Sequence, residues 1–337
     1  MIRLPPFEFL QPHTLAEAAE QLSDCGAEEG ESVRLVAGGT DLWPNMKRRH
    51  QKAETVVSLR GLGEMRRIEA DDGDLVLGAT ATLSEIAAHD LVCERFPSFA
   101  RAARGISTPA LRNMGTLGGN LCLDTRCDYY NQSEEWRRAI DYCMKENGEV
   151  CWVAPSSSRC WAVSSGDCAP ILQVLGARVR LQSRSGERVV SLEALYRDDG
   201  IDYLRKTPGE ILVEVRLPAH SGHDNCRTSF LKLSRRGAID FPVLSIAVCI
   251  WIDRFGRVEK SSIVLGAIAS LPRSVPAAEE SLVGEALNEE RIEEAARLCR
   301  RAATPLDNTD FMAQWRSKMV EVFAAKALAE CAQPLGS

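Results

Sequence analysis

Apolar and polar positions in the first part of the chain alternate between a helical and a strand-like period. Residues 14–22 have apolar side chains at helical spacing, and residues 32–37 predict a strand that ends at a pair of glycines. Residues 41–49 return to the helical period, and residues 55–59 predict a second strand. This strand–helix–strand order predicts two parallel strands joined by a right-handed crossover.

The same kind of pattern continues to about residue 105. Residues 74–79 predict another strand, and residues 82–88 and 96–105 predict helices. Thr82 is followed three residues later by Glu85, which is the spacing of a capping box. We therefore expect the first of these helices to begin directly after Thr82.

Residues 124–162 interrupt this periodicity. Cysteine, tryptophan, tyrosine and charged residues follow one another there without an amphipathic pattern, and we interpret the segment as an insertion. Short strands separated by turns are expected after it, as in an antiparallel or mixed sheet. These strands are predicted over residues 170–176, 178–182, 188–191 and 211–217.

The last third of the chain predicts a further unit of strands followed by helices. Three strands are expected first, and Asp253-Arg254-Phe255-Gly256 predicts a hairpin turn between the second and the third. Two helices follow, the first with a break near Gly284. The strands cover residues 229–233, 244–253 and 257–268, and the helices cover residues 279–302 and 310–331.

The composition is that of an ordinary globular protein. Of the 337 residues, 45% are hydrophobic and 26% are charged, which is enough for two or three packed units. The net charge of −6 argues against partners such as nucleic acids and anionic membranes, since both need a basic face. Residues 1–14 lack the apolar region of a signal peptide, and the longest apolar stretch, residues 243–252, is too short to cross a bilayer. We expect a cytoplasmic protein that does not contact a membrane.

Two pairs of glycines are candidate binding loops. Gly38 and Gly39 end a predicted strand, and Gly118 and Gly119 follow some eighty residues later. Paired glycines let the backbone approach a ligand closely, and consecutive amides can form a nest for a pyrophosphate. Neither pair matches a Rossmann or a P-loop motif, and either pair alone is more often only a turn. Side chains that can add hydrogen bonds are those of Thr40, Thr108, Thr116 and Asn120.

The twelve cysteines are unevenly distributed, and a disulfide framework is not expected in a reducing cytosol. Cys127, Cys143, Cys151 and Cys160 fall within the insertion, with 15, 7 and 8 residues between them and several aromatic residues among them. Four thiolates can hold zinc or an iron–sulfur cluster. The short cysteine knuckles of structural zinc sites are missing, so the spacing favours an iron–sulfur cluster over zinc. Unligated thiols are the third possibility, and Cys122 is a competing ligand that we interpret as a packing residue.

Residues 111–120, together with residues 37–41, resemble the FAD-binding subunit of the xanthine dehydrogenase and carbon monoxide dehydrogenase family. Residues 164–170 resemble the Ser-Asp segment of that family, and residues 231–236 resemble the opening of its C-terminal domain. The resemblance implies an α+β fold. A two-lobed, PCMH-type FAD-binding domain would be followed by a C-terminal domain of a three-stranded antiparallel sheet with helices. The expected divisions are residues 1–60, 61–222 (with the insertion at 124–162) and 223–337.

The resemblance also implies residue roles. Asp167 is assigned to the adenosine side of FAD, where a carboxylate can accept hydrogen bonds from ribose hydroxyls, with a loop cap as the alternative. Lys232 is assigned near the flavin or the ADP moiety, with a lysine at a strand edge as the alternative. The other residues expected to bind FAD are Ala37, Gly38, Gly39, Thr40, Asp41, Thr108, Thr116, Gly118, Gly119 and Asn120.

The insertion limits the resemblance to one group of flavin subunits within this family. About forty residues with four spaced cysteines separate the Gly-Gly-Asn motif from the Ser-Asp segment, which is similar to the β-subunit family of 4-hydroxybenzoyl-CoA reductases. In that family the loop cysteines ligate a [4Fe–4S] cluster, and the matching positions are Cys127, Cys143, Cys151 and Cys160. The implied reaction removes a phenolic hydroxyl with two electrons and two protons, giving benzoyl-CoA and water.

The implied partners are a large subunit with the molybdenum cofactor and a small subunit with two [2Fe–2S] clusters, paired as a dimer of heterotrimers. Electrons from reduced ferredoxin would pass through the loop cluster and FAD to those centres. No general acid or base is assigned, since the histidines (His13, His50, His89, His220 and His223) show no metal-ligand or triad spacing. Three alternatives remain: a flavin subunit for another substrate, a zinc-stapled nucleotide-binding protein and a stand-alone flavin reductase.

Overall fold

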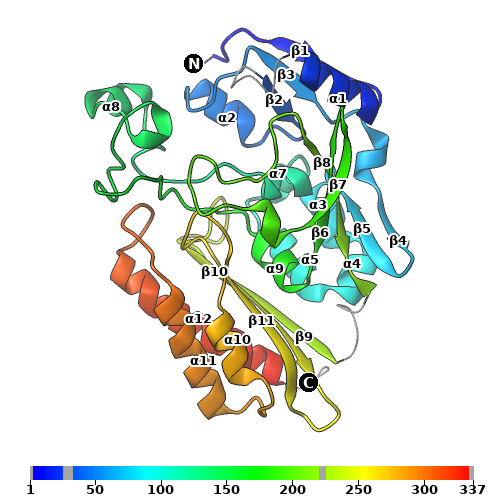
Figure 1. Cartoon of the computed structure of the whole chain (residues 1–337), viewed down its shortest axis with the longest axis vertical. Helices are drawn as coiled ribbons and strands as arrows, with labels where there is room; N and C mark the ends of the chain where they lie inside the picture. The colour runs from blue at the N-terminus through cyan, green and yellow to red at the C-terminus, as the bar shows by residue number, and fades with distance from the viewer. Residues whose placement is uncertain (1–2, 26–32, 220–224, 334–337) are drawn as a thin grey trace.

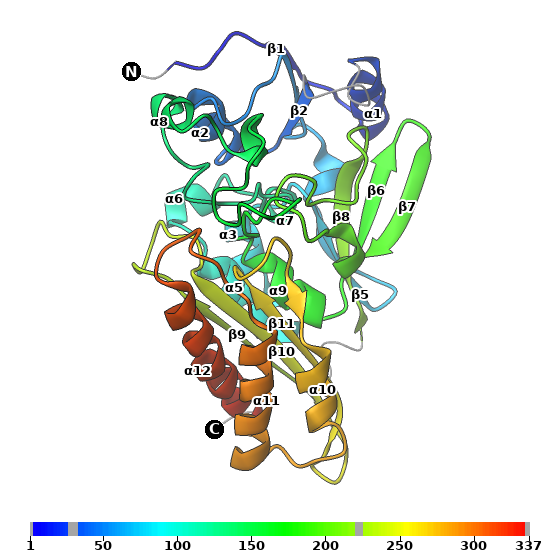
Figure 2. The ribbon, with the colours of Figure 1, turned by 60° about the vertical axis from the view of Figure 1, so that its left-hand side comes forward.

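The computed structural model describes residues 3–25, 33–219 and 225–333. Two α/β lobes lie above a C-terminal layer in which helices cover a sheet (Figure 1). Turning the molecule shows that the insertion, with its short helix α8, lies on the side of the first lobe near α2 (Figure 2). No helix in the described part of the chain is long and apolar enough to cross a membrane. The expected division at residues 222 and 223, together with His220 and His223, lies outside the described residues.

The first lobe is built on a three-stranded parallel sheet in the order β1-β3-β2. The parallel pairing of β2 with β3 confirms the predicted strand–helix–strand unit. Ser32, the first residue of that predicted strand, lies outside the described residues. The third strand, β1, is too short to show a period in the sequence. The elements are β1 (Glu8–Leu10), α1 (Leu15–Asp24), β2 (Val33–Val36), α2 (Leu42–Lys47) and β3 (Thr55–Ser58).

The second lobe has a five-stranded antiparallel sheet in the order β4-β5-β8-β6-β7, with short helices beside it. The predicted capping box is confirmed, because the Thr82 and Glu85 side chains each bond a backbone amide at the start of α3. The strands are β4 (Ile68–Asp71), β5 (Asp74–Gly78), β6 (Arg178–Ser183), β7 (Gly186–Ser191) and β8 (Ile211–Leu217). The helices are α3 (Leu83–Ala88), α4 (Asp90–Arg95), α5 (Pro97–Arg104), α6 (Pro109–Arg112), α7 (Leu117–Leu121) and α9 (Cys168–Val174), with short 3-10 turns at Gly63–Arg66 and Glu193–Leu195.

Helix α9 corrects the strand predicted over residues 170–176. Its residues are buried on nearly all sides, so the sequence has a continuous apolar run without helical periodicity. Pro170 falls in the first turn, where a helix does not need the missing amide. The helix packs against α5 and α7 on one side and against β10 and β11 on the other. It therefore joins the second lobe to the C-terminal domain.

The C-terminal domain has a sheet in the order β12-β11-β10-β9, antiparallel throughout, with three helices packed on one face. The three predicted strands are present, and the two-residue β12 adds a fourth that the three-stranded expectation missed. The break predicted near Gly284 within residues 279–302 is confirmed, because the first helix ends at Leu282 and Gly284 adopts a φ of 83°. The elements are β9 (Cys226–Leu233), β10 (Leu244–Ile252), β11 (Val258–Gly266), β12 (Arg273–Ser274), α10 (Pro276–Leu282), α11 (Glu289–Ala302) and α12 (Ala313–Ala332).

The segment interpreted as an insertion is mostly irregular. It contains only helix α8 (Glu134–Ala139) and a 3-10 turn at Met144–Glu146. Its two ends meet, because Arg126 and Val163 each donate a backbone hydrogen bond to the other, at 2.8 and 2.7 Å. A small separate core inside the segment includes Cys127, Tyr130 and Cys160. The segment is therefore closed at its base and has its own packed interior.

Candidate functional site

The two glycine loops lie directly against each other. A Cβ atom at Gly38 would overlap the backbone carbonyl of Met114, which directly precedes the second loop. Gly39 has a φ of 68°, and a Cβ there would overlap the indole of Trp43. Neither position can hold another residue without moving its neighbour. The close contact brings segments almost eighty residues apart side by side.

The first loop leaves its amides free. The N–H groups of Gly38, Gly39 and Thr40 donate to no acceptor within the described part of the chain. They follow a strand and precede helix α2, as expected for a loop that holds an anion. The loop therefore offers consecutive unpaired donors at the point where it meets Met114.

The second loop differs from the expectation that it would offer its amides as well. Gly118 N–H donates to the Ala79 carbonyl at 2.8 Å, and Gly119 N–H donates to the Thr116 hydroxyl at 3.2 Å. A Cβ at Gly118 would lie 2.9 Å from that of Ala79, so this glycine allows close packing. Thr116 caps α7, and Thr108 caps α6 in the same way. The second loop thus supports the first rather than presenting a second amide nest.

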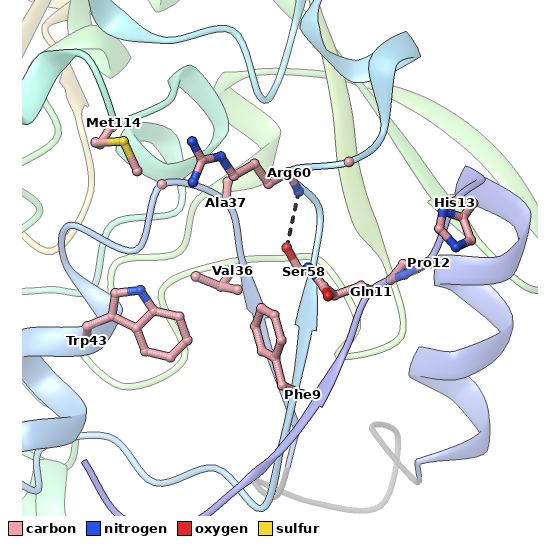
Figure 3. Close-up of a pocket in the computed structure, with 12 residues that line it drawn as sticks. Phe9, Gln11, Pro12, His13, Val36, Ala37, Trp43, Ser58, Arg60 and Met114 are labelled. Atoms are coloured by element: carbon pink, nitrogen blue, oxygen red, sulfur yellow. Dashed lines mark hydrogen bonds between the residues drawn. The ribbon is translucent and has the colours of Figure 1, made fainter. Parts of the chain in front are cut away.

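A cavity of about 530 Å³ opens beside the loop contact. Its lining includes Gly38 from the first loop, Met114 from the segment before the second loop, Phe9 from β1 and Trp43 from α2. Figure 3 shows the Arg60 side chain reaching across this cavity toward Ala37 and Met114. Its guanidinium has no partner among the described residues, so it is available to an anionic ligand. The sequence interpretation missed Arg60, because a single arginine after a strand carries no motif.

Asp41 faces the insertion. Its carboxylate forms an ion pair with Arg126 and accepts a hydrogen bond from Asn45 at 2.9 Å. Burial raises the pKa of Asp41, and the Arg126 guanidinium opposes that shift. Arg126 directly precedes Cys127 and stacks on the Phe241 ring at 4.5 Å. Asp41 therefore ties the first glycine loop to the base of the insertion.

Asp167 and Lys232 were assigned separately from the sequence, and the structure brings them together. Asp167 Oδ2 lies 2.8 Å from Lys232 Nζ, and the two side chains are 4% and 13% exposed. Burial raises the pKa of Asp167 to about 6 although Lys232 opposes the shift. The Asp167 side chain makes no capping bond to α9, which rules out the loop-cap alternative. Lys232 is mostly buried and is not the surface lysine of the other alternative.

This ion pair lies beside the end of the second loop. Asn120 Oδ1 accepts a hydrogen bond from the Cys168 amide at 2.9 Å, and Gly166 packs closely on the Asn120 carbonyl. Asp167 Oδ1 and the hydroxyl of Ser165 are buried without a hydrogen-bond partner in the described structure. Buried polar atoms rarely remain unpaired in proteins. The Asp167 oxygen and the Ser165 hydroxyl are therefore two unpaired polar groups next to the end of the second loop.

The four cysteines of the insertion are all buried. Burial raises the pKa of the Cys127 thiol to about 12 and that of Cys160 to about 11, against the effect of nearby backbone amides. Negative charge on one of these thiols raises the pKa of its neighbours. Cys143 and Cys160 raise the pKa of Cys127, and Cys151 raises the pKa values of Cys143 and Cys160. Cys127, Cys143 and Cys160 share one small packed core, and Cys151 is buried close enough to influence the pKa values of two of them. Cys122 packs instead on the core of the second lobe, as the sequence interpretation expected.

Backbone amides point at the cysteine sulfurs. The Ala162 N–H donates to Cys160 Sγ at 3.4 Å, and the amides of Tyr129 and Tyr130 lower the pKa of Cys127 against burial. No group of three or more His, Cys, Asp or Glu in the described ranges is spaced to hold a single metal ion. The backbone N–H groups directed at Cys127 and Cys160 favour the thiolate forms of these two side chains.

Segments from all parts of the chain hold the insertion in place. The Tyr130 hydroxyl donates to the His50 carbonyl at 2.6 Å, and the Asn308 amide donates to the Trp161 carbonyl at 2.6 Å. Gly200 N–H donates to the Cys160 carbonyl at 3.0 Å. A Cβ at Gly200 would lie only 2.6 Å from Cys160 Sγ. No sequence motif pointed to these supporting residues.

Comparison with known proteins identifies both parts of the chain. Residues 5–220 match the family model of the FAD binding domain in molybdopterin dehydrogenase, and residues 229–331 match that of the CO dehydrogenase flavoprotein C-terminal domain. The chain is 27% identical to the carbon monoxide dehydrogenase medium chain of Afipia carboxidovorans, over 96% of this chain and 95% of the relative. It is 30% identical to an aldehyde oxidoreductase FAD-binding subunit of Escherichia coli, over 82% of this chain and 86% of the relative.

Solved structures agree with these relatives. A chain of the reconstituted CO dehydrogenase from Oligotropha carboxidovorans superposes with a TM-score of 0.80 at 25% identity, over 98% of this chain and 99% of that chain. A chain of quinoline 2-oxidoreductase from Pseudomonas putida has the same fold, with a TM-score of 0.77 at 22% identity over 98% of both chains. The expected arrangement of a PCMH-type FAD-binding domain followed by a C-terminal domain is confirmed.

Proposed function

Because the chain belongs to the family of FAD-binding subunits of the xanthine and carbon monoxide dehydrogenases, we propose that it relays electrons within a molybdenum-dependent reductase. It binds FAD, as the matched domain does, and its relatives are subunits of oxidoreductase complexes. The proposed complex is of the 4-hydroxybenzoyl-CoA reductase type. In it this subunit carries a [4Fe–4S] cluster as well as FAD. The observation that carries the proposal is the buried group of Cys127, Cys143, Cys151 and Cys160.

The glycine-loop site fits the phosphate part of FAD. The free amides of Gly38, Gly39 and Thr40 can bind pyrophosphate oxygens, and Arg60 can add a positive charge from across the cavity. The proposal assigns Asp167 Oδ1 and the Ser165 hydroxyl to hydroxyl groups of the ribose or ribitol, because both are buried without a partner among the described residues. The residues proposed to form or support this site are Ala37, Gly38, Gly39, Thr40, Asp41, Thr108, Thr116, Gly118, Gly119, Asn120, Asp167 and Lys232.

The cysteine group fits an iron–sulfur cluster. Cys127, Cys143 and Cys160 share one packed core with Tyr130, and Tyr129 and Met144 pack against it. Cys151 is also buried, and backbone amides point at the sulfurs of Cys127 and Cys160. Such shielding and N–H···S hydrogen bonds are features of protein-bound clusters. The raised pKa values of Cys127 and Cys160 mean that iron must displace protons when it binds. A bound cluster would exchange single electrons, and bound FAD would exchange one or two.

The partners in the proposal are a large subunit with the molybdenum cofactor and a small [2Fe–2S] subunit, arranged as a dimer of heterotrimers. Reduced ferredoxin is the proposed donor. The substrate site would lie on the large subunit, so the residues of this chain bind and shield redox centres and take no part as acid or base. The domain divisions proposed for this scaffold are residues 1–60, 61–222 and 223–337.

Anaerobic purification followed by analysis of iron, acid-labile sulfide, zinc and released flavin tests the proposal. We expect about one FAD and about four irons with four sulfides per chain, and visible absorbance that dithionite bleaches. Cys127→Ser should lose the iron and keep FAD, whereas the control Cys122→Ser should keep both. FAD with no iron from a strictly anaerobic preparation would remove the cluster and with it the case for this reductase. Stoichiometric zinc without flavin would favour a zinc-stapled nucleotide-binding protein instead.

A second candidate is the flavin subunit of another molybdenum hydroxylase. The names of the relatives favour it, since they include enzymes for carbon monoxide, nicotinate and aldehydes. Assays of the complete complex separate the two candidates. Reduction of 4-hydroxybenzoyl-CoA by a low-potential donor supports the first, whereas oxidation of an aldehyde or N-heterocycle supports the second. Turnover of NAD(P)H by the single purified chain would contradict both and favour a stand-alone flavin reductase.

A further inference from the structure

A buried ion pair lies next to the cysteine group. Lys145 Nζ is 2.8 Å from Asp124 Oδ1, and the two side chains are 6% and 11% exposed. The ammonium also donates to the Thr125 hydroxyl at 2.9 Å and to the Gly200 carbonyl at 2.7 Å. All three of its donor positions are therefore used, which fixes the charge in one place.

Lys145 is connected to two of the proposed cluster ligands. Its backbone amide bonds Cys143, and its ammonium favours the thiolate forms of Cys143 and Cys160, although burial raises the pKa of both thiols. Gly200, which accepts a hydrogen bond from the ammonium, also lies against the Cys160 sulfur. The positive charge thus lies beside the thiols in an interior with little water to screen it.

Lys145 also faces the second lobe, from which the flavin site is built. Its ammonium lies 5.7 Å from the centre of the Tyr203 ring. The Tyr203 hydroxyl donates to the carbonyl of Cys122 at 3.2 Å, directly after the second glycine loop. Lys145 therefore lies between the cysteine group and the end of that loop.

A buried ion pair is weak evidence for a role in stability, because removing two charges from water costs several kcal/mol each. A fixed charge in a low-dielectric interior has a strong effect on any neighbouring group whose charge changes. A [4Fe–4S] cluster gains one negative charge on reduction, and net charge is one of the properties that set its potential.

We propose that the Lys145–Asp124 pair sets the reduction potential of the cluster held by the four cysteines, an inference that rests on the function proposed above. Lys145 stabilises the added electron and raises the potential, and Asp124 limits that effect. Both are positioning residues, because neither side chain is a ligand. The pair would adjust how readily the cluster accepts an electron from its donor.

The test is a redox titration of the full anaerobic protein, with the cluster followed by electron paramagnetic resonance. At a fixed applied potential, Lys145→Met should lower the ratio of reduced to oxidised cluster about tenfold. This corresponds to a reduction potential that is ~59 mV lower for a one-electron couple. Asp124→Asn should raise the ratio by a similar factor, and Lys145→Arg should stay near the wild-type value. Arg138→Met is the matched control, since it removes a cation from the same insertion whose side chain is 67% exposed and screened by solvent.

An unchanged potential in both Lys145→Met and Asp124→Asn, with iron and sulfide at wild-type levels, would overturn the inference and leave the proposed function intact. If Lys145→Met fails to assemble the cluster, Asp124→Asn decides the matter by the direction of its shift. An equal shift in Arg138→Met would show a general charge effect and would also overturn the inference. A wild-type protein without iron would instead refute the proposed function.

Discussion

Asp167 and Lys232 form a buried ion pair across the junction of the FAD-binding and C-terminal domains. Removing one partner of such a pair leaves an uncompensated buried charge, which is far more costly than removing both. Lys232→Met should destabilise the protein by about 3 kcal/mol at pH 8. The double variant Asp167→Asn/Lys232→Met should recover most of that loss. Urea unfolding measures both, and a double variant as unstable as Lys232→Met would show that the lysine acts through packing and not through charge.

The pH dependence of stability provides a separate test of Asp167. Its pKa is about 6 in the folded chain against 3.8 when exposed, because burial disfavours the charged form. The folded state therefore binds this proton more tightly than the unfolded state. The contribution of Asp167 to stability is fully present below pH 3.8 and is lost as the pH rises through 6. It amounts to on the order of 3 kcal/mol.

Asp167→Asn should remove this part of the pH profile and leave the remainder unchanged. The comparison to make is the free energy of unfolding of the two proteins between pH 4 and pH 8, measured in the same buffer series. Parallel curves for the two proteins over that window would contradict the shifted pKa.

The contact between the two glycine loops predicts a specific loss of flavin. Gly38→Ala places a methyl group into the carbonyl of Met114, so the loops must separate. We expect the FAD content after purification to fall at least tenfold. Gly61→Ala is the control in the same cavity, because its new methyl would make only an ordinary contact with Pro12 at 3.7 Å. Equal FAD content in the two variants would mean that the loop contact does not determine binding.

The close approach of Gly200 to Cys160 provides a test of Cys160 as an iron ligand. A methyl group at this residue would lie 2.6 Å from Cys160 Sγ and must displace the sulfur. Gly200→Ala should therefore lose most of its iron while it keeps FAD. In Gly63→Ala the new methyl meets nothing within 4 Å, so that variant should keep both. Iron and flavin assays on anaerobic preparations distinguish the two results, and full iron in Gly200→Ala would place the ligand elsewhere.

We expect low pH to weaken the attachment of the insertion, because it protonates His50. Its ring lies on Tyr130 and its Nε2 bonds the Gln132 carbonyl at 3.0 Å, while burial lowers its pKa from 6.5 to about 4. The folded chain favours the neutral ring, so this contribution to stability is present above pH 6.5 and is lost as the pH falls toward 4.

Amide hydrogen exchange measures this effect. Exchange over residues 128–140 should speed up about tenfold between pH 7 and pH 5, after correction for the intrinsic rate. His50→Gln should show a much smaller change. The same acceleration in both proteins would assign the effect to another group.

The periodic elements could be predicted from the sequence because their signals are local. The capping box at Thr82 and the hairpin turn that begins at Asp253 each depend on residues within one or two turns of chain. The parallel strand–helix–strand unit on either side of Gly38 depends on the period within each of its short segments. Helix α9 shows the limit of such signals. It is buried between two domains, so its apolar run has no polar side to mark a helical period.

Some features of the candidate site could likewise be predicted from the sequence, and others could not. The glycine loops and the four cysteines are readable as types of residue at a spacing. That spacing does not show that the amides of Gly38 and Gly39 remain free while those of Gly118 and Gly119 are used internally. The second loop passes alongside Ala79, and only the folded chain brings that carbonyl within reach.

The sequence by itself determined the kinds of groups available: paired glycines, four spaced thiols, a carboxylate in the Ser-Asp segment and a lysine at the opening of the C-terminal domain. Tertiary structure decided which of them meet. Asp167 forms an ion pair with Lys232 of another domain, and Asp124 forms one with Lys145 beside the thiols. Such pairings depend on the packing of segments far apart in the chain. Because charge interactions depend on distance and burial, their effects on a proton or an electron are set only once the chain has folded.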